Sequence, residues 1–146
     1  MQIRLMIDDD LDQVTDLWDQ HVAEVGGAAF DPDSRMRIFS GLCRCLPAVE
    51  SVCFVALVDQ QIVGFVVGAL TGKTTWAVQS GDIEEVYVIP ANRRQKIGTE
   101  LVKQMTEWMR AKGCETIRTR VDTEAPESRA FWKAMGWEGD QIHFPN

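Results

Sequence analysis

Apolar residues recur every three or four positions in four stretches of the chain, a spacing that predicts amphipathic helices. In the first stretch Asp8 or Asp9 is expected to cap the helix and Gly26-Gly27 to end it. Pro32 opens the second stretch and Pro47 stops it, while Gly113 and Gly136 end the third and the fourth. The predicted helices therefore run from about Leu11 to Val25, Pro32 to Leu46, Ile97 to Lys112 and Pro126 to Met135.

Short runs of apolar and β-branched residues between these helices predict strands. The run Val52–Val58 is apolar throughout, so we expect both of its faces to be covered. A polar loop around Trp76 is expected over Thr71–Gly81. The predicted strands are Ile3–Met6, Val52–Val58, Ile62–Leu70, Ile83–Ile89, Thr116–Val121 and Trp137–Phe144.

The resulting order is β-α-α-β-β-β-α-β-α-β. The strand–helix–strand unit over residues 83–121 requires a right-handed crossover and a parallel pair. The remaining neighbours along the chain are hairpin-like, so the sheet is mixed. We therefore predict an α/β fold with a mixed sheet and helices on both of its faces.

Composition is that of a globular protein and suggests a single domain over residues 1–146. The chain has 146 residues, of which 45% are hydrophobic and 25% charged, and its formal net charge is −7. An acidic surface disfavours nucleic acid and anionic lipid and favours cationic ligands. The longest apolar run, Ile62–Leu70, is far short of the roughly 20 residues of a membrane span. With no export signal recognised at the N-terminus, a cytoplasmic location is expected.

The cysteines give no clear metal-ligand pattern. Cys43 and Cys45 fall in a predicted helix, and the two histidines, His21 and His143, are remote from them in sequence. We interpret all the cysteines, including Cys53 and Cys114, as reduced and mostly buried, and we expect no metal site.

The stretch from Val88 to Leu101 carries the most chemical information. A strand is ended by Pro90, and a short loop with Arg93, Arg94 and Lys96 leads through Gly98 into a helix. Unpaired N–H groups and the positive end of the helix dipole favour an anion there, and a pyrophosphate would fit. From these residues alone, a solvated basic turn without a ligand remains the alternative.

This stretch resembles the loop of the GNAT superfamily of acyl-CoA-dependent N-acetyltransferases, Gln/Arg-x-x-Gly-x-Gly/Ala. Here it reads Arg93-Arg-Gln-Lys-Ile-Gly98, with Lys96 at the first glycine position. The preceding Ile83–Val88 strand and the closing segment Phe131-Trp-Lys-Ala-Met-Gly136-Trp are similar as well. The resemblance implies a mostly antiparallel twisted sheet in which two parallel strands are splayed apart.

The resemblance also implies where acetyl-CoA would bind. Pantetheine would pair with Val86, Tyr87 and Val88 as an extra strand, and the Val88 N–H would polarise the thioester carbonyl. The pyrophosphate would bind the loop and helix start, where Lys96 serves as well as glycine only if its φ is negative. Ser128 is expected to replace a family asparagine that is Ala125 here. The implied cofactor residues are Val86, Tyr87, Val88, Arg93, Arg94, Gln95, Lys96, Ile97, Gly98, Thr99, Ser128 and Trp132.

Two carboxylates are the candidate catalytic residues, Glu84 and Glu85. Glu84 stands four residues before Val88, where several family members carry a glutamate, and we expect it to act as general base. Attraction of a cationic substrate and a structural ion pair are the alternatives. Strand alternation places Glu85 on the other face. Trp132 occupies the position of the family's tyrosine acid, so no general acid is assigned.

The predicted activity is acetyl transfer from acetyl-CoA to a primary amine of a small molecule by direct attack. Ile83-Glu84, Asp122-Thr123-Glu124 and the tail Gln141–Phe144 are similar to aminoglycoside 6′-N-acetyltransferases, whose polycationic acceptors suit an acidic chain. A protein or peptide N-acetyltransferase and a non-catalytic acyl-CoA-binding module are the alternatives. A homodimer is compatible with the sequence.

Overall fold

The computed structural model describes residues 1–24, 31–72, 79–119, 126–137 and 142–143, with the side chains of all except 126–129 and 142–143. The described strands form one six-stranded sheet in the order β1-β2-β3-β4-β5-β6. Their bounds are β1 Gln2–Leu5, β2 Ser51–Val58, β3 Gln61–Thr71, β4 Ser80–Val88, β5 Thr116–Thr119 and β6 Ile142–His143. β4 and β5 pair in parallel and all other neighbours pair antiparallel. The predicted mixed sheet is thereby confirmed.

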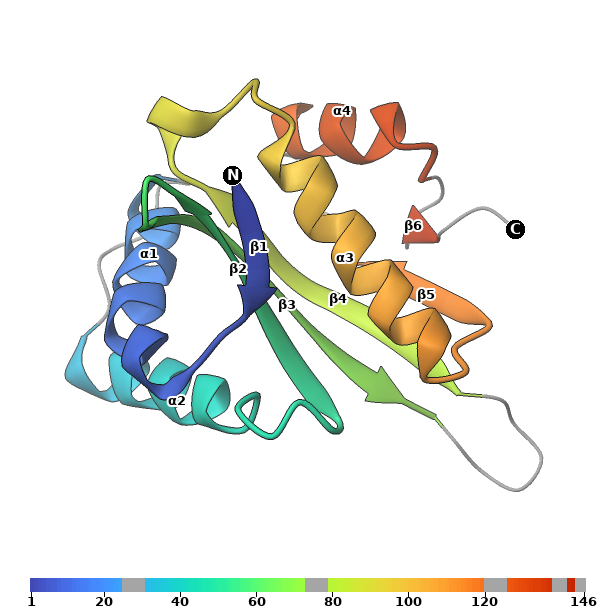
Figure 1. Ribbon diagram of the computed structural model, residues 1–146, viewed down its shortest axis with the longest axis horizontal. Coiled ribbons are helices and arrows are strands. Elements are labelled where there is room, and N and C mark those ends of the chain that lie inside the picture. The colour runs from blue at the N-terminus through green and yellow to red at the C-terminus, as the bar shows by residue number, and fades with distance from the viewer. Residues whose placement is uncertain (25–30, 73–78, 120–125, 138–141, 144–146) are drawn as a thin grey trace.

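Helices cover both faces of the sheet, as Figure 1 shows. Helices α1 (Leu11–Glu24) and α2 (Pro32–Cys43) bury a cluster against one face that includes Phe65, Val55 and Tyr87. Helix α3 (Ile97–Ala111) and helix α4 (Pro126–Ala134) lie on the other face. The core there contains Leu101, Val102, Met105, Met109, Trp132 and Trp137. The predicted covering of both faces of the sheet is therefore confirmed.

The central strands follow the apolar pattern closely, but β4 begins earlier than predicted. Ser80, Gly81 and Asp82 pair with β3 on one side and with β5 on the other. Two flanking strands satisfy the backbone of this polar segment, so pairing overrides its low strand propensity. Trp76 and the rest of residues 73–78 lie outside the described residues.

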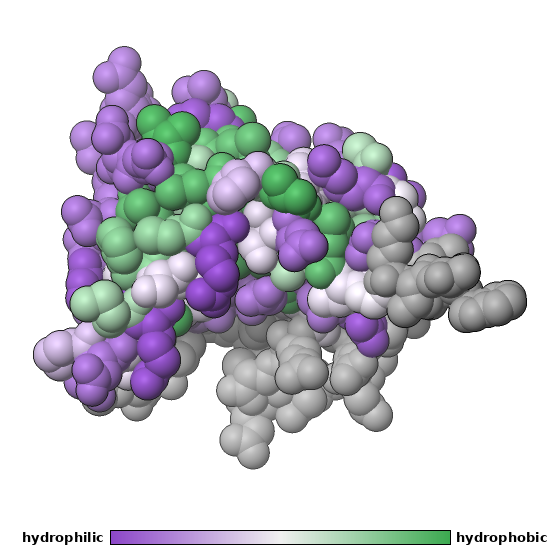
Figure 2. All heavy atoms as spheres, turned by 90° about the horizontal axis from the view of Figure 1, so that it is seen from below, coloured by the Kyte–Doolittle hydropathy of each residue, from purple (hydrophilic) through white to green (hydrophobic). Residues whose placement is uncertain are grey.

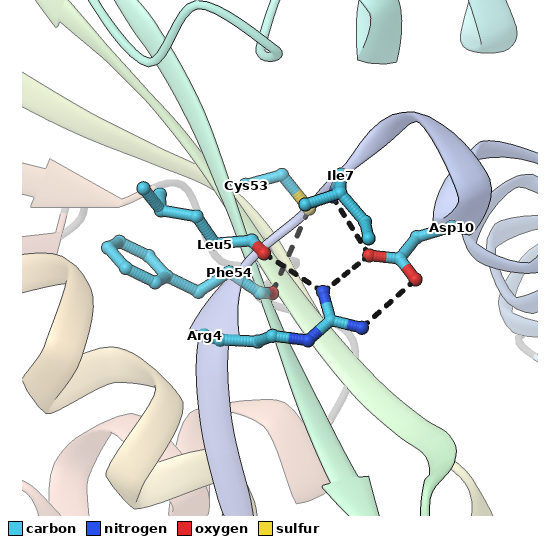
Figure 3. A network of polar contacts seen from close by, with 6 residues as sticks. All are labelled: Arg4, Leu5, Ile7, Asp10, Cys53 and Phe54. Carbon is cyan, nitrogen blue, oxygen red and sulfur yellow. Dashed lines mark hydrogen bonds and ion pairs between the residues drawn. The ribbon is translucent and has the colours of Figure 1, made fainter.

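A network of polar contacts fixes the corner between β1 and α1 (Figure 3). The Arg4 guanidinium donates to both carboxylate oxygens of Asp10, at 2.6 and 3.2 Å, and the Ile7 N–H donates to the same carboxylate at 2.9 Å. The prediction that Asp8 or Asp9 caps the first helix is therefore wrong. A short 3-10 helix, Asp8–Asp10, precedes α1 and brings Asp10 back to the β1 end.

The second helix starts as its sequence predicts. The Asp31 carboxylate accepts the Ser34 N–H at 2.7 Å, and Pro32 occupies the first turn.

Seen from the side on which α2 lies, the surface carries hydrophobic residues with hydrophilic ones between them (Figure 2). Of the cysteines, Cys45, Cys53 and Cys114 are buried. Within the described residues, we find no helix that is both long and apolar enough to cross a membrane.

Candidate active site

The carboxyl half of β4 has one edge that β5 does not pair with in the described residues. The parallel register ends at Ile83 and Thr119, whereas β4 continues to Val88. On the other edge, the Ile89 N–H donates to the Val63 carbonyl at 2.9 Å. Since hydrogen-bonding direction alternates along an antiparallel pair, the N–H and C=O groups of Val86 and Val88 point toward the open edge. An extended ligand could pair there as an additional strand.

A β-bulge interrupts β4 at Glu84. Val67 pairs with Glu85 and Gly68 with Ile83, which leaves Glu84 as the extra residue. A bulge places two residues of one strand opposite one residue of its partner and so shifts the alternation of side chains by one position.

The packing on either side of the bulge shows this shift. Ile83 packs in the cluster under α3, whereas Glu85 contacts His21 of α1 on the opposite face. In an unbroken strand these two residues would share one face. Val86 and Val88 return to the α3 side, and Tyr87 lies under α1.

Glu84 and Glu85 therefore lie on the same side of the sheet, and the prediction of opposite faces is wrong. The carboxylate of Glu84 is close enough to Arg44 and Cys45, at the end of α2, for their charges to affect its pKa and that of the thiol. The bulge supplies the physical reason, because it changes the alternation between Ile83 and Glu85.

The surroundings of Glu84 favour its protonated form. Desolvation is the largest cause that raises the pKa of its carboxyl above the ordinary value, followed by the charge of Asp82; Arg44 opposes the shift. The side chain is nevertheless accessible to solvent. An accessible carboxylate with a raised pKa is suited to accept a proton from a bound amine.

Glu85 is held by a partner. Its Oε1 lies 2.9 Å from His21 Nε2, and the imidazole ring also packs against Tyr87 at 4.9 Å between ring centroids. Among the described residues, the buried Nδ1 of His21 has no hydrogen-bond partner. The contact with Glu85 and the packing against Tyr87 therefore hold the imidazole between α1 and β4.

The loop after β4 leads into the first turn of α3, where the sequence predicts an anion site. The first backbone bond of α3 joins the Glu100 N–H to the Lys96 carbonyl, so the N–H groups of Ile97, Gly98 and Thr99 precede the helical bonding pattern. A Cβ built on Gly98 would lie 3.8 Å from Val88 Cγ2, which places this helix start next to Val88, the last residue of β4. Arg94, Gln95 and Lys96 are exposed in the same loop.

Two residues of this loop adopt left-handed backbone conformations. Lys96, at the position of the family's glycine, has φ +62°, and Arg94 has φ +68°. Lys96 could replace glycine without cost only with a negative φ, and the structure has a positive φ instead. The loop keeps the conformation that glycine would favour, and the lysine carries a strain of about 1–2 kcal/mol.

The guanidinium of Arg93 is already engaged by other groups of the chain. Its Nε donates to the Val88 carbonyl at 2.9 Å, and its guanidinium pairs with Glu24 of α1. The same group lies 5.5 Å above the centre of the Tyr87 ring. The hydroxyl of Tyr87 also donates to Glu24, at 3.5 Å.

Trp132 was expected to contact the cofactor, but the structure places it in the core. Only 5% of its surface is exposed, and its ring packs against Trp137 at 4.9 Å. The Phe131 ring instead approaches the helix start: a Cβ on Gly98 would lie 3.1 Å from it. Ser128 lies in α4, but its side chain, like Ala125, is outside the described residues.

Sequence reasoning missed His21 and Glu24. The sequence assigns His21 no role, yet its side chain is only 21% exposed and contacts Glu85. Their spacing of three on a helix places both residues on one face, which is a signal only once that face is known to pack on β4.

The chain matches the family model described as Acetyltransferase (GNAT) family over residues 11–137. Among curated proteins, it is 38% identical over 63 residues to the thialysine N-epsilon-acetyltransferase of Mus musculus and 32% identical to that of Bos taurus. The match covers 43% of this chain but only 37% of each of these relatives.

Solved structures share the fold. An aminoglycoside antibiotic 6′-N-acetyltransferase from Acinetobacter haemolyticus is 19% identical, with a TM-score of 0.78 over 95% of this chain and 92% of that one. A transcriptional regulator from Bacillus halodurans is 22% identical, with a TM-score of 0.80 over 94% of this chain and 93% of that one. With the family match over most of the chain, and the open strand edge beside a helix start, the chain belongs to the GNAT acetyltransferase family.

Proposed function

We propose that this protein transfers an acetyl group from acetyl-CoA to a primary amine of a small molecule. The observation that carries the proposal is the open edge of β4 at Val86–Val88, which lies directly beside the N-terminus of α3. A ligand with an extended amide-containing arm and a pyrophosphate matches both features at once. Acetyl-CoA has this combination.

The residues present fit this ligand. The N–H and C=O groups of Val86 can pair with the amides of pantetheine, while the Val88 carbonyl already accepts a hydrogen bond from Arg93 Nε. The N–H groups from Arg94 to Thr99 can hold the pyrophosphate, aided by the positive end of the α3 dipole and the charges of Arg94 and Lys96.

Two groups of the chain would act in the reaction. Acetyl-CoA supplies an activated thioester. The N–H of Val88 donates to the thioester carbonyl oxygen, where negative charge develops. Glu84 takes the proton of the attacking amine, directly or through water, as the new C–N bond forms and the C–S bond breaks. The thiolate leaves with the electron pair of the C–S bond and takes a proton from the solvent.

The acceptor is proposed to be cationic. Asp82, Glu84 and Glu85 place three carboxylates along β4, and the net charge of the chain is −7. Long-range attraction of this kind favours the encounter with a positively charged amine. The similarity to enzymes named for thialysine and the fold shared with aminoglycoside acetyltransferases make these two kinds of amine the first acceptors to test.

The test has two steps. Binding of CoA is measured by calorimetry and by thermal shift, since a ligand that binds only the folded state stabilises it by about 2.7 kcal/mol at a hundredfold excess over its Kd. Release of free thiol from acetyl-CoA is then measured with thialysine, lysine, an aminoglycoside and a peptide with a free N-terminus. Binding without thiol release would identify an acyl-CoA-binding module, and release with the peptide alone would identify a peptide acetyltransferase. Absence of CoA binding would overturn the proposal.

A further inference from the structure

The last turns of α1 are fastened to β4 by two polar bridges. His21 and Glu24 lie three positions apart and so on one face of the helix. His21 contacts Glu85 at 2.9 Å, and Glu24 accepts from both Tyr87 and Arg93. Glu85 and Tyr87 are β4 residues that alternate with Val86 and Val88 of the open edge, and Arg93 lies in the loop that follows β4. The position of α1 is therefore linked to the strand that the proposed cofactor would pair with.

Arg93 is the centre of the second bridge. Its Nε–H donates to the Val88 carbonyl, while a different nitrogen of the same planar group pairs with Glu24. The Val88 carbonyl points toward the open edge, at the last residue of β4. One rigid side chain therefore joins the end of the proposed oxyanion-binding strand to α1, over the face of Tyr87. Arg94, the next residue, is exposed in the loop and has the same charge.

We propose that Arg93 is a positioning residue that couples α1 to the end of β4, and that its guanidinium is not a phosphate ligand. By bonding both Glu24 and the Val88 carbonyl, Arg93 fixes the position of α1 relative to the open edge of β4. Its loss therefore impairs use of the acceptor while CoA binding is retained. This inference rests on the proposed acetyl transfer, and it replaces the role that the loop's resemblance implies for this side chain.

Calorimetry with CoA separates the two roles of an arginine in this loop. We expect Arg93→Gln to bind CoA within about threefold of the wild type. The matched control is Arg94→Gln, which removes the same charge from the neighbouring position and should weaken CoA binding about tenfold, as loss of a charge-assisted contact does. Equal weakening of CoA binding by both variants would overturn the proposal.

Steady-state kinetics tests the coupling itself. We expect Arg93→Gln to lower kcat/KM for the amine by about tenfold, a typical size for coupling between two sites. Glu24→Gln should give a similar loss, and the double variant should be no worse than either single variant, because both remove one bridge. Additive losses, or a wild-type rate in Glu24→Gln, would contradict the coupling.

A conservative variant provides an independent check. Lysine at position 93 keeps the charge but lacks the planar fork that reaches two acceptors in different directions. Arg93→Lys should therefore remain impaired with the amine, whereas Arg94→Lys should bind CoA nearly as the wild type does. Full recovery in Arg93→Lys would show that only the charge matters. If wild-type protein binds no CoA or releases no thiol with any amine, the proposed function fails instead, before any Arg93 variant is compared.

Discussion

The Thr119 hydroxyl donates a hydrogen bond to the Ile83 carbonyl at 3.0 Å, at the last pair of the parallel register between β4 and β5. The next residue of β4 is Glu84, the extra residue of the bulge. Within the described part of the chain, the last parallel pair therefore directly precedes the change of side-chain alternation. At this point the sheet presents two carboxylates on one face and an open backbone edge beyond them.

Glu84→Gln keeps the size of the side chain and removes its basicity. If Glu84 is the general base, kcat with a good amine acceptor should fall by at least about 10² near neutral pH. CoA binding should be unchanged, because the carboxylate is not part of the anion site. If Glu84 only attracts the acceptor, KM should rise while kcat holds.

The dependence of kcat on pH gives a second readout for Glu84. Its pKa is raised above the ordinary value of 4.5, so the basic form is lost as pH falls through the raised value. We expect an acidic limb in the profile of the wild type that is absent from Glu84→Gln. The control is Glu85→Gln, whose carboxylate is already bonded to His21, and which should reduce kcat much less. A larger loss in Glu85→Gln would make Glu85 the base.

Asp10 should contribute to stability in a pH-dependent way. Burial alone would raise its pKa, but the hydrogen bonds from Arg4 and from the Ile7 N–H outweigh burial and lower it below the ordinary value of 3.8. The stabilisation is therefore present above pH 3.8 and is lost as pH falls through the lowered pKa.

Urea unfolding measures this contribution. At pH 7 Asp10→Asn should lower the free energy of unfolding by about 1–3 kcal/mol, since it leaves the Arg4 guanidinium without its charged partner. The difference between the two proteins should shrink in acid, if both remain folded there. A difference that stays constant with pH would show that the Asp10 charge contributes nothing.

Lys96→Gly should stabilise the fold. Lys96 has φ +62°, a conformation that glycine adopts without strain. We expect the free energy of unfolding to rise by about 1 kcal/mol and Tm to rise accordingly. The matched control is Lys103→Gly in the middle of α3, which should destabilise by about 1 kcal/mol because glycine is a poor helix former. Destabilisation by Lys96→Gly would refute the left-handed conformation of this residue.

Gly64→Ala should disturb the open edge of β4. A Cβ at this position would lie 2.8 Å from the Tyr87 carbonyl oxygen, so the backbone of one strand must shift. We expect a loss of about 1–3 kcal/mol in the free energy of unfolding, together with weaker CoA binding. Gly41→Ala is the control, because its Cβ would meet only the Arg44 guanidinium, at 3.5 Å, and a helix favours alanine. Wild-type stability in Gly64→Ala would contradict the close contact between β3 and β4.

The spacing of apolar residues was enough to predict the helices and most strands. Each helix buries one face against the sheet, so its apolar residues must recur every three or four positions in the sequence. The order of the elements then required a parallel pair between the fourth and fifth strands, which the structure has. The basic loop and Gly98 likewise marked the helix start as an anion site, because orphan N–H groups are a property of any such terminus.

Tertiary structure alone decided which groups meet at that site. The bulge at Glu84 arises from the register between β3 and β4. Because of it, Glu85 lies on the α1 face, whereas simple alternation from Ile83 would place it on the α3 face. Arg93 and Glu24 are separated by 69 positions, and no local pattern pairs them. Periodicity records how a residue relates to its own helix or strand, whereas these contacts depend on how separate elements pack. The left-handed Lys96 has the same origin: the packed loop holds a conformation that the residue itself disfavours.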